Sequence, residues 1–220
     1  RTAFIEGEMP PNEILGRMNA MHTRVPVNDL EAGRRMDAVT DFGDYILKLP
    51  FQLHIDSGRN VQSLIAAIRE AVHAGAKLIF VDYMQVFVAK GNKDNEFSQI
   101  KALSEALRKL SLINNVHIVA ASSLNRLEVG NEKITLNSFY GGSQLGHDCA
   151  TAFILSAQER QGEEVRTVTC DVVKNRHGRK GEFKINYELR TQNMVEAAEV
   201  MVMRAEPDEP FYEQGNLYEE

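Results

Sequence analysis

Acidic side chains follow two apolar runs of the sequence, a position from which they could serve a bound phosphate and its metal ion. Asp82 directly follows Leu78-Ile79-Phe80-Val81, and Glu8 comes shortly after Ala3-Phe4-Ile5. ATPases place a carboxylate after a buried strand, near the Mg²⁺ of the nucleotide. A second carboxylate can polarise an attacking water. The structural alternatives are a capping Asp and an acid favoured by a helix N-terminus.

Basic and small polar residues supply further candidates for phosphate binding. A basic cluster comprises Lys174, Arg176, Arg179, Lys180 and Lys184. It could reach an anionic phosphate, or its lysines could protect an edge strand from aggregation. Ser122-Ser123-Leu124-Asn125-Arg126 could sense a phosphate or form a plain strand-to-loop transition. Gly141-Gly142-Ser143-Gln144 could let backbone amides approach a phosphodiester chain, although most such glycine pairs are only turns.

Three catalytic motifs are absent from the sequence. It contains no Gly-x-Ser-x-Gly, no His-x-x-x-His spacing and no Gly-x-x-x-x-Gly-Lys-[Ser/Thr]. The last of these is the loop that cradles the phosphates of a nucleotide. We therefore expect the 220-residue chain alone to hydrolyse ATP only at background rate.

These candidates need a scaffold of strands and helices to position them. Hydrophobic patterns predict strands at 3–5, 51–55, 78–81, 116–121 and 152–155, and a hairpin of 166–174 with 182–189. Predicted helices begin at Pro10, Asp29, Asn60 and Asp94, and residues 124–140 are predicted to form a loop. This order predicts an α/β fold with a sheet that is parallel first and antiparallel at one edge. Ligands bind beyond the carboxyl ends of the strands in such sheets.

Composition and charge narrow the class of protein. The 43% hydrophobic and 25% charged residues are typical of a globular domain. Two cysteines exclude a disulfide scaffold or an all-cysteine zinc site and suggest a reducing compartment. The net charge is −6, of which residues 196–220 carry −7 and the rest +1, so any binding of a polyanion must be local. No membrane span or signal peptide is predicted, and the first residue, Arg1, suggests a fragment of a longer protein.

Five segments together resemble the C-terminal motor domain of the DnaB-like replicative DNA helicases, which include the Twinkle and phage primase-helicase branches. Glu8-Met9 is similar to the family's "SLEM", and Val81-Asp82-Tyr83-Met84-Gln85 to "IDYLQ", its Walker B motif. Residues 116–126 are similar to "VPVVALSQLNR", and residues 140–155 to "YGGSKASQEADNVLIL". Val173-Lys174-Asn175-Arg176-His177-Gly178 is similar to "AKQRNG". The five occur in the family's order over about residues 3–189.

The resemblance implies a RecA-like core that assembles as a ring, usually a hexamer, with ATP and Mg²⁺ at the subunit interfaces. Glu8 would orient the attacking water, and Asp82 would hold Mg²⁺ through its water shell. We prefer Glu8 to Glu6 because Met9 and a helix follow it, and we expect both side chains on one face of the first strand. Lys174 and Arg176 would reach the neighbouring subunit's ATP site.

The resemblance also assigns residues to nucleotide sensing and to DNA. Gln85 belongs to the Walker B motif, and Ser123 occupies the position of the family's sensor glutamine. Single-stranded DNA would be tracked in the central channel without sequence readout. The residues implied in that contact are Asn125, Arg126, Lys133, Gly141, Gly142 and Ser143. The family's phosphate loop would precede Arg1.

We therefore expect residues 1–195 to form an N-terminally truncated helicase motor domain and residues 196–220 an acidic, disordered tail. The expected activity is ATP-dependent 5′→3′ translocation and unwinding, and the tail could dock a primase or polymerase. The expected location is the cytoplasm of a bacterium or a phage-infected cell, with an organelle matrix as the alternative. Other hypotheses are a strand-exchange or clock-type ATPase of the same fold, and a hydrolysis-dead module that binds single strands or a partner.

Overall fold

The computed structural model describes residues 1–56, 58–88, 93–124, 135–140, 143–197 and 202–203. Within them a four-stranded parallel sheet has the order β2 (Phe51–Ile55), β1 (Thr2–Glu6), β3 (Leu78–Asp82) and β4 (His117–Ala120). This confirms the predicted strands and the α/β class. The carboxyl ends of all four parallel strands lie at one edge of this sheet, where the polar candidates were expected.

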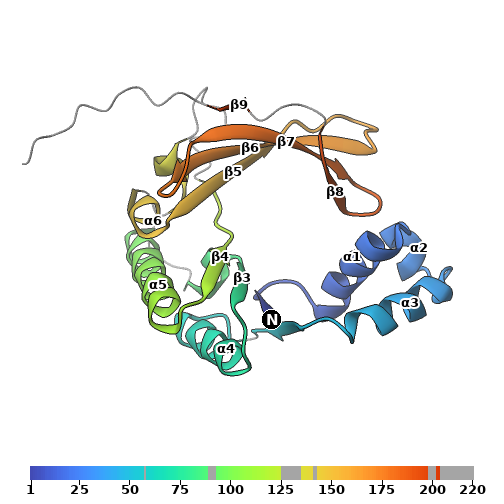
Figure 1. The fold of residues 1–220 in the computed structure, drawn as a ribbon, viewed down its shortest axis with the longest axis horizontal. Coiled ribbons are helices and arrows are strands. Elements are labelled where there is room, and N and C mark those ends of the chain that lie inside the picture. The colour runs from blue at the N-terminus through green and yellow to red at the C-terminus, as the bar shows by residue number, and fades with distance from the viewer. Residues whose placement is uncertain (57, 89–92, 125–134, 141–142, 198–201, 204–220) are drawn as a thin grey trace, which may run out of the picture.

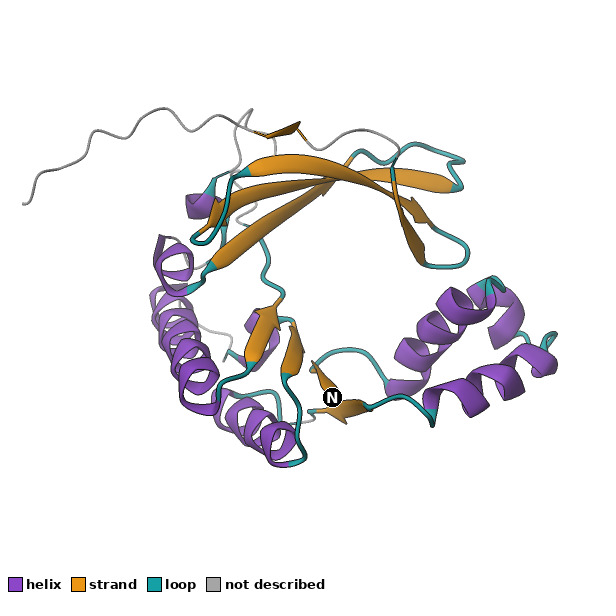
Figure 2. Cartoon of the chain, viewed as in Figure 1, coloured by secondary structure: helices purple, strands orange, loops and turns teal. Residues whose placement is uncertain are grey.

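Helices α4 (Val61–His73) and α5 (Lys93–Asn114) cover one face of the parallel sheet (Figures 1 and 2). Helix α4 begins where the sequence predicted, because Asn60 and Ser63 form a capping box. The Asn60 side chain accepts a hydrogen bond from the Ser63 amide, and the Ser63 side chain accepts one from the Asn60 amide. It ends before Gly75, whose φ of +90° suits glycine. The core between sheet and helices includes the fully buried Ile5, Leu64, Ile68, Ile79, Ile100 and Leu103.

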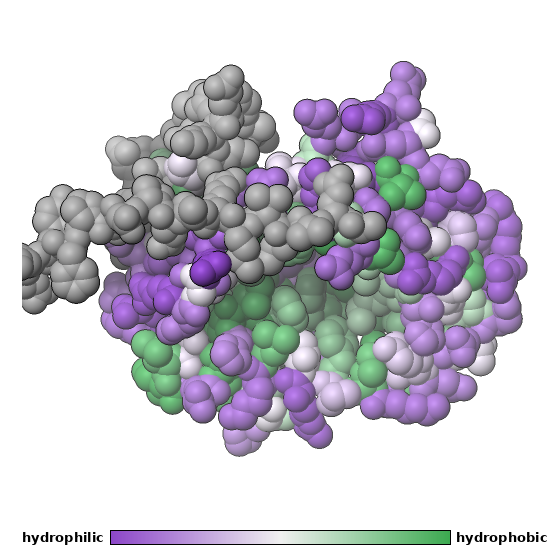
Figure 3. Space-filling view, turned by 45° about the horizontal axis from the view of Figure 1, so that its top comes forward, coloured by the Kyte–Doolittle hydropathy of each residue, from purple (hydrophilic) through white to green (hydrophobic). Residues whose placement is uncertain are grey.

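The opposite face of the parallel sheet carries a second apolar row. Phe4 is the register partner of both Leu53 and Phe80, and Phe80 is the partner of Val119. Val119 is 49% exposed, and the rest of the row is partly buried. Figure 3 shows a hollow lined by hydrophobic residues in this part of the molecule. Parallel sheets normally have both faces covered, so this row is a surface that another element can cover.

The antiparallel strands form a sheet of their own within the described residues. It consists of β5 (Thr151–Ala157), β6 (Val165–Asn175), β7 (Gly181–Glu188) and β8 (Asn193–Glu196), with β9 (Val202–Met203) paired to β7. The predicted hairpin is confirmed as β6–β7, but it does not continue the edge of the parallel sheet. The chain between β4 and β5 includes α6 (Ser143–Asp148) and the short turn η2 (Leu136–Ser138), and among the described residues no strand of this second sheet pairs with β4.

An N-terminal helical group completes the described fold. It contains α1 (Pro11–Thr23), α2 (Val27–Glu31) and α3 (Met36–Ile46). The sequence predicted one helix over 29–47, but Gly33 at φ +67° separates two. The group docks on the β7–β8 turn, where the Val27 amide donates to the Arg190 carbonyl at 3.0 Å. The Asn193 side chain donates to the Met21 carbonyl at 3.2 Å.

Several remaining expectations can be placed on this fold. Cys149 and Cys170 are both free. None of the described helices has the length and apolar character needed to span a bilayer. Most of the predicted acidic tail, 196–220, lies outside the described residues; Glu196 ends β8, and Val202–Met203 form β9.

Candidate active site

The ends of β1 and β3 bring two acids together. Glu6 and Asp82 are register partners in this parallel pair, and each is the last residue of its strand. The Gly7 amide then donates to the Asp82 carbonyl at 3.2 Å, which extends the pairing by one residue. Two carboxylates that are far apart in the sequence thus meet at the sheet edge where ligands of α/β proteins bind.

The turn after β1 corrects the expected placement of Glu8. The strand ends at Glu6, whose side chain is 1% exposed, while Glu8 lies in the following bend and is exposed. The two side chains therefore do not share a strand face. The physical reason is that Glu6 Oε1 accepts the backbone amides of Glu8 at 2.6 Å and Met9 at 2.9 Å, which turns the chain out of the sheet.

Gly7 lets this turn pack closely against the segment after β3. A Cβ at Gly7 would lie 2.7 Å from Val86 Cγ1 and 2.9 Å from Phe87 Cζ. Both residues belong to the short 3₁₀ turn η1 (Met84–Phe87), in which Phe87 is fully buried. A larger residue at position 7 would push the two strand ends apart.

The negative charges of the neighbouring acids act on Asp82. Burial raises the pKa of Asp82 above its ordinary value, and the charges of Glu6 and Glu8 raise it further, while Arg17 opposes the shift. Burial also raises the pKa of Tyr83, which is a hydrogen-bonding partner of the Glu8 side chain. The cluster of Glu6, Glu8 and Asp82 therefore has an unfavourable excess of negative charge, which a nearby cation would relieve.

The chemistry of these side chains fits a magnesium ion held together with a phosphate. Among the described residues, no group of three or more His, Cys, Asp or Glu side chains is arranged to hold a metal ion alone. Mg²⁺ is usually held by one or two carboxylates together with waters and substrate phosphates. Asp82, half-buried at a strand end with hard oxygen atoms, suits that second mode of binding.

Gln85 connects the end of β3 to the end of β4. Its Nε2 donates to Ser122 Oγ at 2.9 Å, and its Oε1 accepts the Ser123 amide at 3.2 Å. The same Nε2 lies 3.5 Å from the Tyr140 carbonyl. The amide of Tyr140 in turn donates to the Ser123 carbonyl at 2.9 Å. The Gln85 side chain, which the sequence assigned to the nucleotide site, therefore already makes hydrogen bonds to the end of β4 and approaches the segment at Tyr140.

Tyr140 stands immediately before the glycine pair predicted to contact DNA. Its hydroxyl donates to Glu96 Oε2 at 2.6 Å, and its ring stacks on Phe97 with centroids 5.1 Å apart. The predicted DNA residues Asn125, Arg126, Lys133, Gly141 and Gly142 lie outside the described residues. Ser143 is the first residue of α6.

The structure places Lys174 and Arg176 on the antiparallel sheet and directs both toward the end of α6. Lys174 Nζ donates to the Gly146 carbonyl, and Arg176 donates from its guanidinium to the His147 carbonyl. The last carbonyls of a helix lack partners within it, and cations are favoured at this end. Both basic groups are thus bonded to their own chain on the antiparallel side, whereas Asp82 ends β3 of the parallel sheet and Glu8 lies in the bend after β1.

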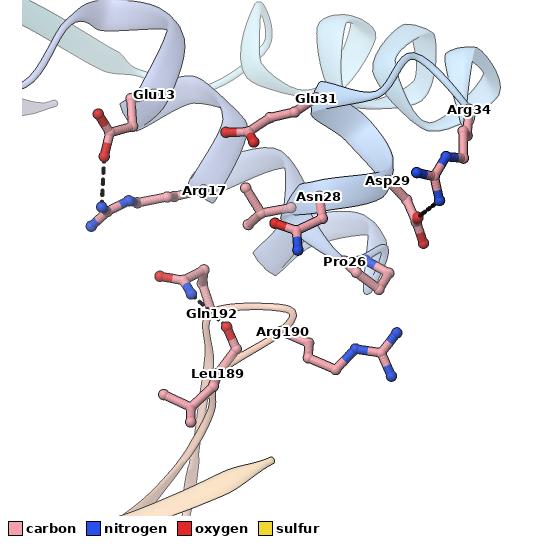
Figure 4. A pocket seen from close by; sticks show the side chains of 11 residues that line it. Glu13, Arg17, Pro26, Asn28, Asp29, Glu31, Arg34, Leu189, Arg190 and Gln192 are labelled. Carbon is pink, nitrogen blue, oxygen red and sulfur yellow. Dashed lines mark hydrogen bonds and ion pairs between the residues drawn. The ribbon is translucent and has the colours of Figure 1, made fainter. Parts of the chain in front are cut away.

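Two features of the site were not identified from the sequence. One is the structural role of Glu6, for which the only signal was its position two residues before Glu8. The other is the influence of Arg17 on Asp82, which comes from α1 and has no local sequence signal. Arg17 also lines a polar cavity of about 540 Å³ between α1–α2 and the β7–β8 turn (Figure 4). There it pairs with Glu13 at 2.7 Å.

Comparison with known proteins agrees with this arrangement. The chain is 23% identical to a probable plasmid replicative DNA helicase of Chlamydia psittaci over 184 aligned residues. The alignment covers 80% of this chain and 40% of that protein. The structure matches that of a DnaB-like replicative helicase, which was solved to show its interactions with primase. The TM-score is 0.75 at 18% identity, and the match covers 88% of this chain and 50% of that one. It also matches a second solved structure, an ATPase domain, with a TM-score of 0.76, 18% identity and coverage of 89% and 74%.

The chain thus spans less than half the length of the curated helicase that it matches. The structural matches confirm the predicted RecA-like fold with its parallel sheet. The family model for the DnaB-like helicase C terminal domain matches residues 1–196, nearly the whole of the described region. With strand order, motif order and this match in agreement, the chain belongs to the DnaB-like helicase C-terminal domain family.

Proposed function

We propose that this chain is the motor part of a replicative helicase that uses ATP and Mg²⁺ to move along single-stranded DNA and unwind a duplex. The observation that supports the proposal is the pairing of the β1 and β3 ends, where Glu6 and Asp82 are register partners and the charge of Glu8 acts on the pKa of Asp82. Two carboxylates in this relation can divide the work of hydrolysis between a metal ion and a water. The polarity, 5′→3′, comes only from the resemblance to the family.

Each acid has a distinct role in this proposal. Asp82 would hold Mg²⁺, and the bound metal ion would supply neutralisation of the charge that develops on the phosphates. Glu8 is exposed at the bend; on releasing its hydrogen bond with Tyr83 it turns toward a water, which it orients as general base. Gln85 and Ser123, which are joined by a hydrogen bond between the ends of β3 and β4, would sense the state of the nucleotide.

The phosphate loop must come from elsewhere in the longer protein, because the sequence of this chain contains none. The apolar row of Phe4, Phe80 and Val119 and the outer edge of β4 offer a place for it. A strand and helix seated there would cover the exposed face of the parallel sheet. By itself the 220-residue chain would then hydrolyse ATP at background rate.

The active assembly is a ring, by resemblance a hexamer, in which Lys174 and Arg176 act on the neighbouring subunit's nucleotide. To do so they exchange the α6 carbonyls for phosphate oxygens, which are stronger acceptors for a cation. The resemblance assigns the contact with single-stranded DNA to the segment 124–143. Residues 196–220 act as a docking segment for a primase or polymerase, and the protein works in the cytoplasm.

The test is ATPase activity on the complete gene product, with and without single-stranded DNA. Asp82→Ala and Glu8→Gln should each lower the DNA-stimulated rate by about 10²-fold or more. Glu70→Ala, a change of an exposed acid on α4, is the matched control and should leave the rate unchanged. Wild-type turnover by Asp82→Ala would refute the proposed site.

Unwinding of a forked duplex separates this proposal from its rivals. A strand-exchange or clock-type ATPase would hydrolyse ATP without opening the fork. A hydrolysis-dead module would bind single strands with no turnover in any variant.

A further inference from the structure

The two carboxylate oxygens of Glu6 differ in their hydrogen bonding. Its side chain is 1% exposed, and one oxygen, Oε1, accepts the amides of the two residues that follow Gly7. The other oxygen, Oε2, is buried and has no hydrogen-bond partner among the described residues. Leaving a buried acceptor unsatisfied costs stability, and an ionised carboxylate is more costly still.

The backbone of Glu6 is fixed from both sides. Its carbonyl accepts the Asp56 amide at 2.9 Å, at the end of β2. On the other side, the Gly7 amide donates to the Asp82 carbonyl. The residue that holds the Glu8 amide is therefore itself anchored in the sheet, between β2, which Asp56 follows, and β3, which ends in Asp82.

This arrangement fixes the backbone of Glu8 relative to Asp82. The amide of Glu8 is 2.6 Å from an oxygen that cannot move without disturbing the strand ends. Glu8 itself is exposed, and no helix or strand holds its backbone. Without the bonds to Glu6, the bend between β1 and α1 would be free to adopt several conformations, and the Glu8 side chain would sample many positions.

We propose that Glu6 is a positioning residue for Glu8: its buried carboxylate holds the turn that presents Glu8 beside Asp82. The inference rests on the proposed function, in which Glu8 orients the attacking water. It assigns to Glu6 no contact with the nucleotide. Orientation of a catalytic group is worth large rate factors, and small misplacements are costly.

The experiment uses the complete gene product and measures kcat and KM for ATP with single-stranded DNA present. Glu6→Ala removes the acceptor and should lower kcat by about 10-fold or more, with KM within about 2-fold of wild type. Glu6→Gln keeps an acceptor oxygen and should retain about one third of the activity or more. Glu6→Asp shortens the side chain by one methylene and so withdraws the acceptor, and its kcat should fall between those of Glu6→Ala and Glu6→Gln. Glu70→Ala is the control.

A double-mutant comparison separates positioning from a general loss of structure. If Glu6 acts through Glu8, Glu6→Ala should cause no further loss in a Glu8→Gln background. An equal fold-loss in both backgrounds would overturn the inference, as would a Glu6→Gln variant as impaired as Glu6→Ala. Should Glu6→Ala fail to fold, Glu6→Asp provides the same comparison. Wild-type activity of Glu8→Gln alone would instead refute the proposed function.

Discussion

Glu6 and Asp82 are the last residues of two adjacent parallel strands and are paired in register, so their backbones are held side by side at the carboxyl edge of the sheet. Only one of the two side chains is available to a ligand. Glu6 is buried and bonded to the following turn, while Asp82 is half-buried with a raised pKa. The pair therefore divides into a residue that shapes the site and a residue that can serve a bound cation.

The charge at Asp82 should limit the stability of the protein. Because its folded pKa is raised, ionised Asp82 opposes folding at pH values above that pKa, and its contribution to stability is greatest at low pH. Asp82→Asn should therefore raise the melting temperature by a few degrees at neutral pH without Mg²⁺. The gain should disappear as pH falls and the wild-type Asp82 takes up a proton. Scanning calorimetry across the acid range measures this.

Asp37 is the control of opposite sign. A hydrogen bond from Arg35 lowers the pKa of Asp37 to about 2, so the ionised form is favoured in the folded state. Asp37→Asn should not raise the melting temperature at any pH. If Asp82→Asn and Asp37→Asn change the melting temperature in the same direction, the excess of negative charge assigned to the cluster of Glu6, Glu8 and Asp82 does not destabilise the protein.

Gly7→Ala should destabilise the protein by about 1–3 kcal/mol, because a Cβ there would overlap Val86 and Phe87. Gly16→Ala is the matched control. Gly16 lies within α1 with nothing near its Cβ position, so alanine should stabilise by about 0.5–1 kcal/mol. Urea unfolding of both variants measures the free energy of unfolding and so tests the close approach of the turn after β1 to η1. An equal change in that free energy in the two variants would contradict the close approach.

Loss of the Gln85 amide should uncouple ATP hydrolysis from DNA. Gln85→Ala removes the contacts to Ser122 and Ser123 and the approach to Tyr140, next to the predicted DNA loop. We expect the ratio of DNA-stimulated to basal ATPase rate to fall about 5-fold or more. Gln62→Ala, at an exposed position of α4, is the control. An unchanged ratio in Gln85→Ala would exclude this route between the two sites.

Mixing experiments should show whether Arg176 acts across a subunit boundary. Arg176→Ala and Asp82→Ala proteins should each be about 10³-fold impaired. Mixed rings would contain some interfaces with both wild-type residues, so the mixture should regain activity in proportion to those interfaces. Arg69→Ala, on the surface of α4, controls for loss of a positive charge. A mixture no more active than its components would place Arg176 in its own subunit's site or outside any site.

Local sequence determined most of the elements of this fold. The apolar run before Asp82 forms β3, and the cap at Asn60 and the glycine at position 75 bound α4 as predicted. These features depend on residues close together in the chain. The position of Asp82 at a strand end follows from the same local pattern, so the sequence alone identified half of the candidate site.

Tertiary structure decided what depends on distant contacts. Glu6 and Glu8 were expected on one strand face. Burial of Glu6 beside β3 and its bonds to the amides of Glu8 and Met9 end the strand and separate the two side chains. Lys174 and Arg176 were identified from their charge and from the motif resemblance of residues 173–178, but only the packing of α6 against β6 supplied the carbonyls that hold them. Side-chain partners of this kind come from the register and packing of segments far apart in the chain, which no local pattern encodes.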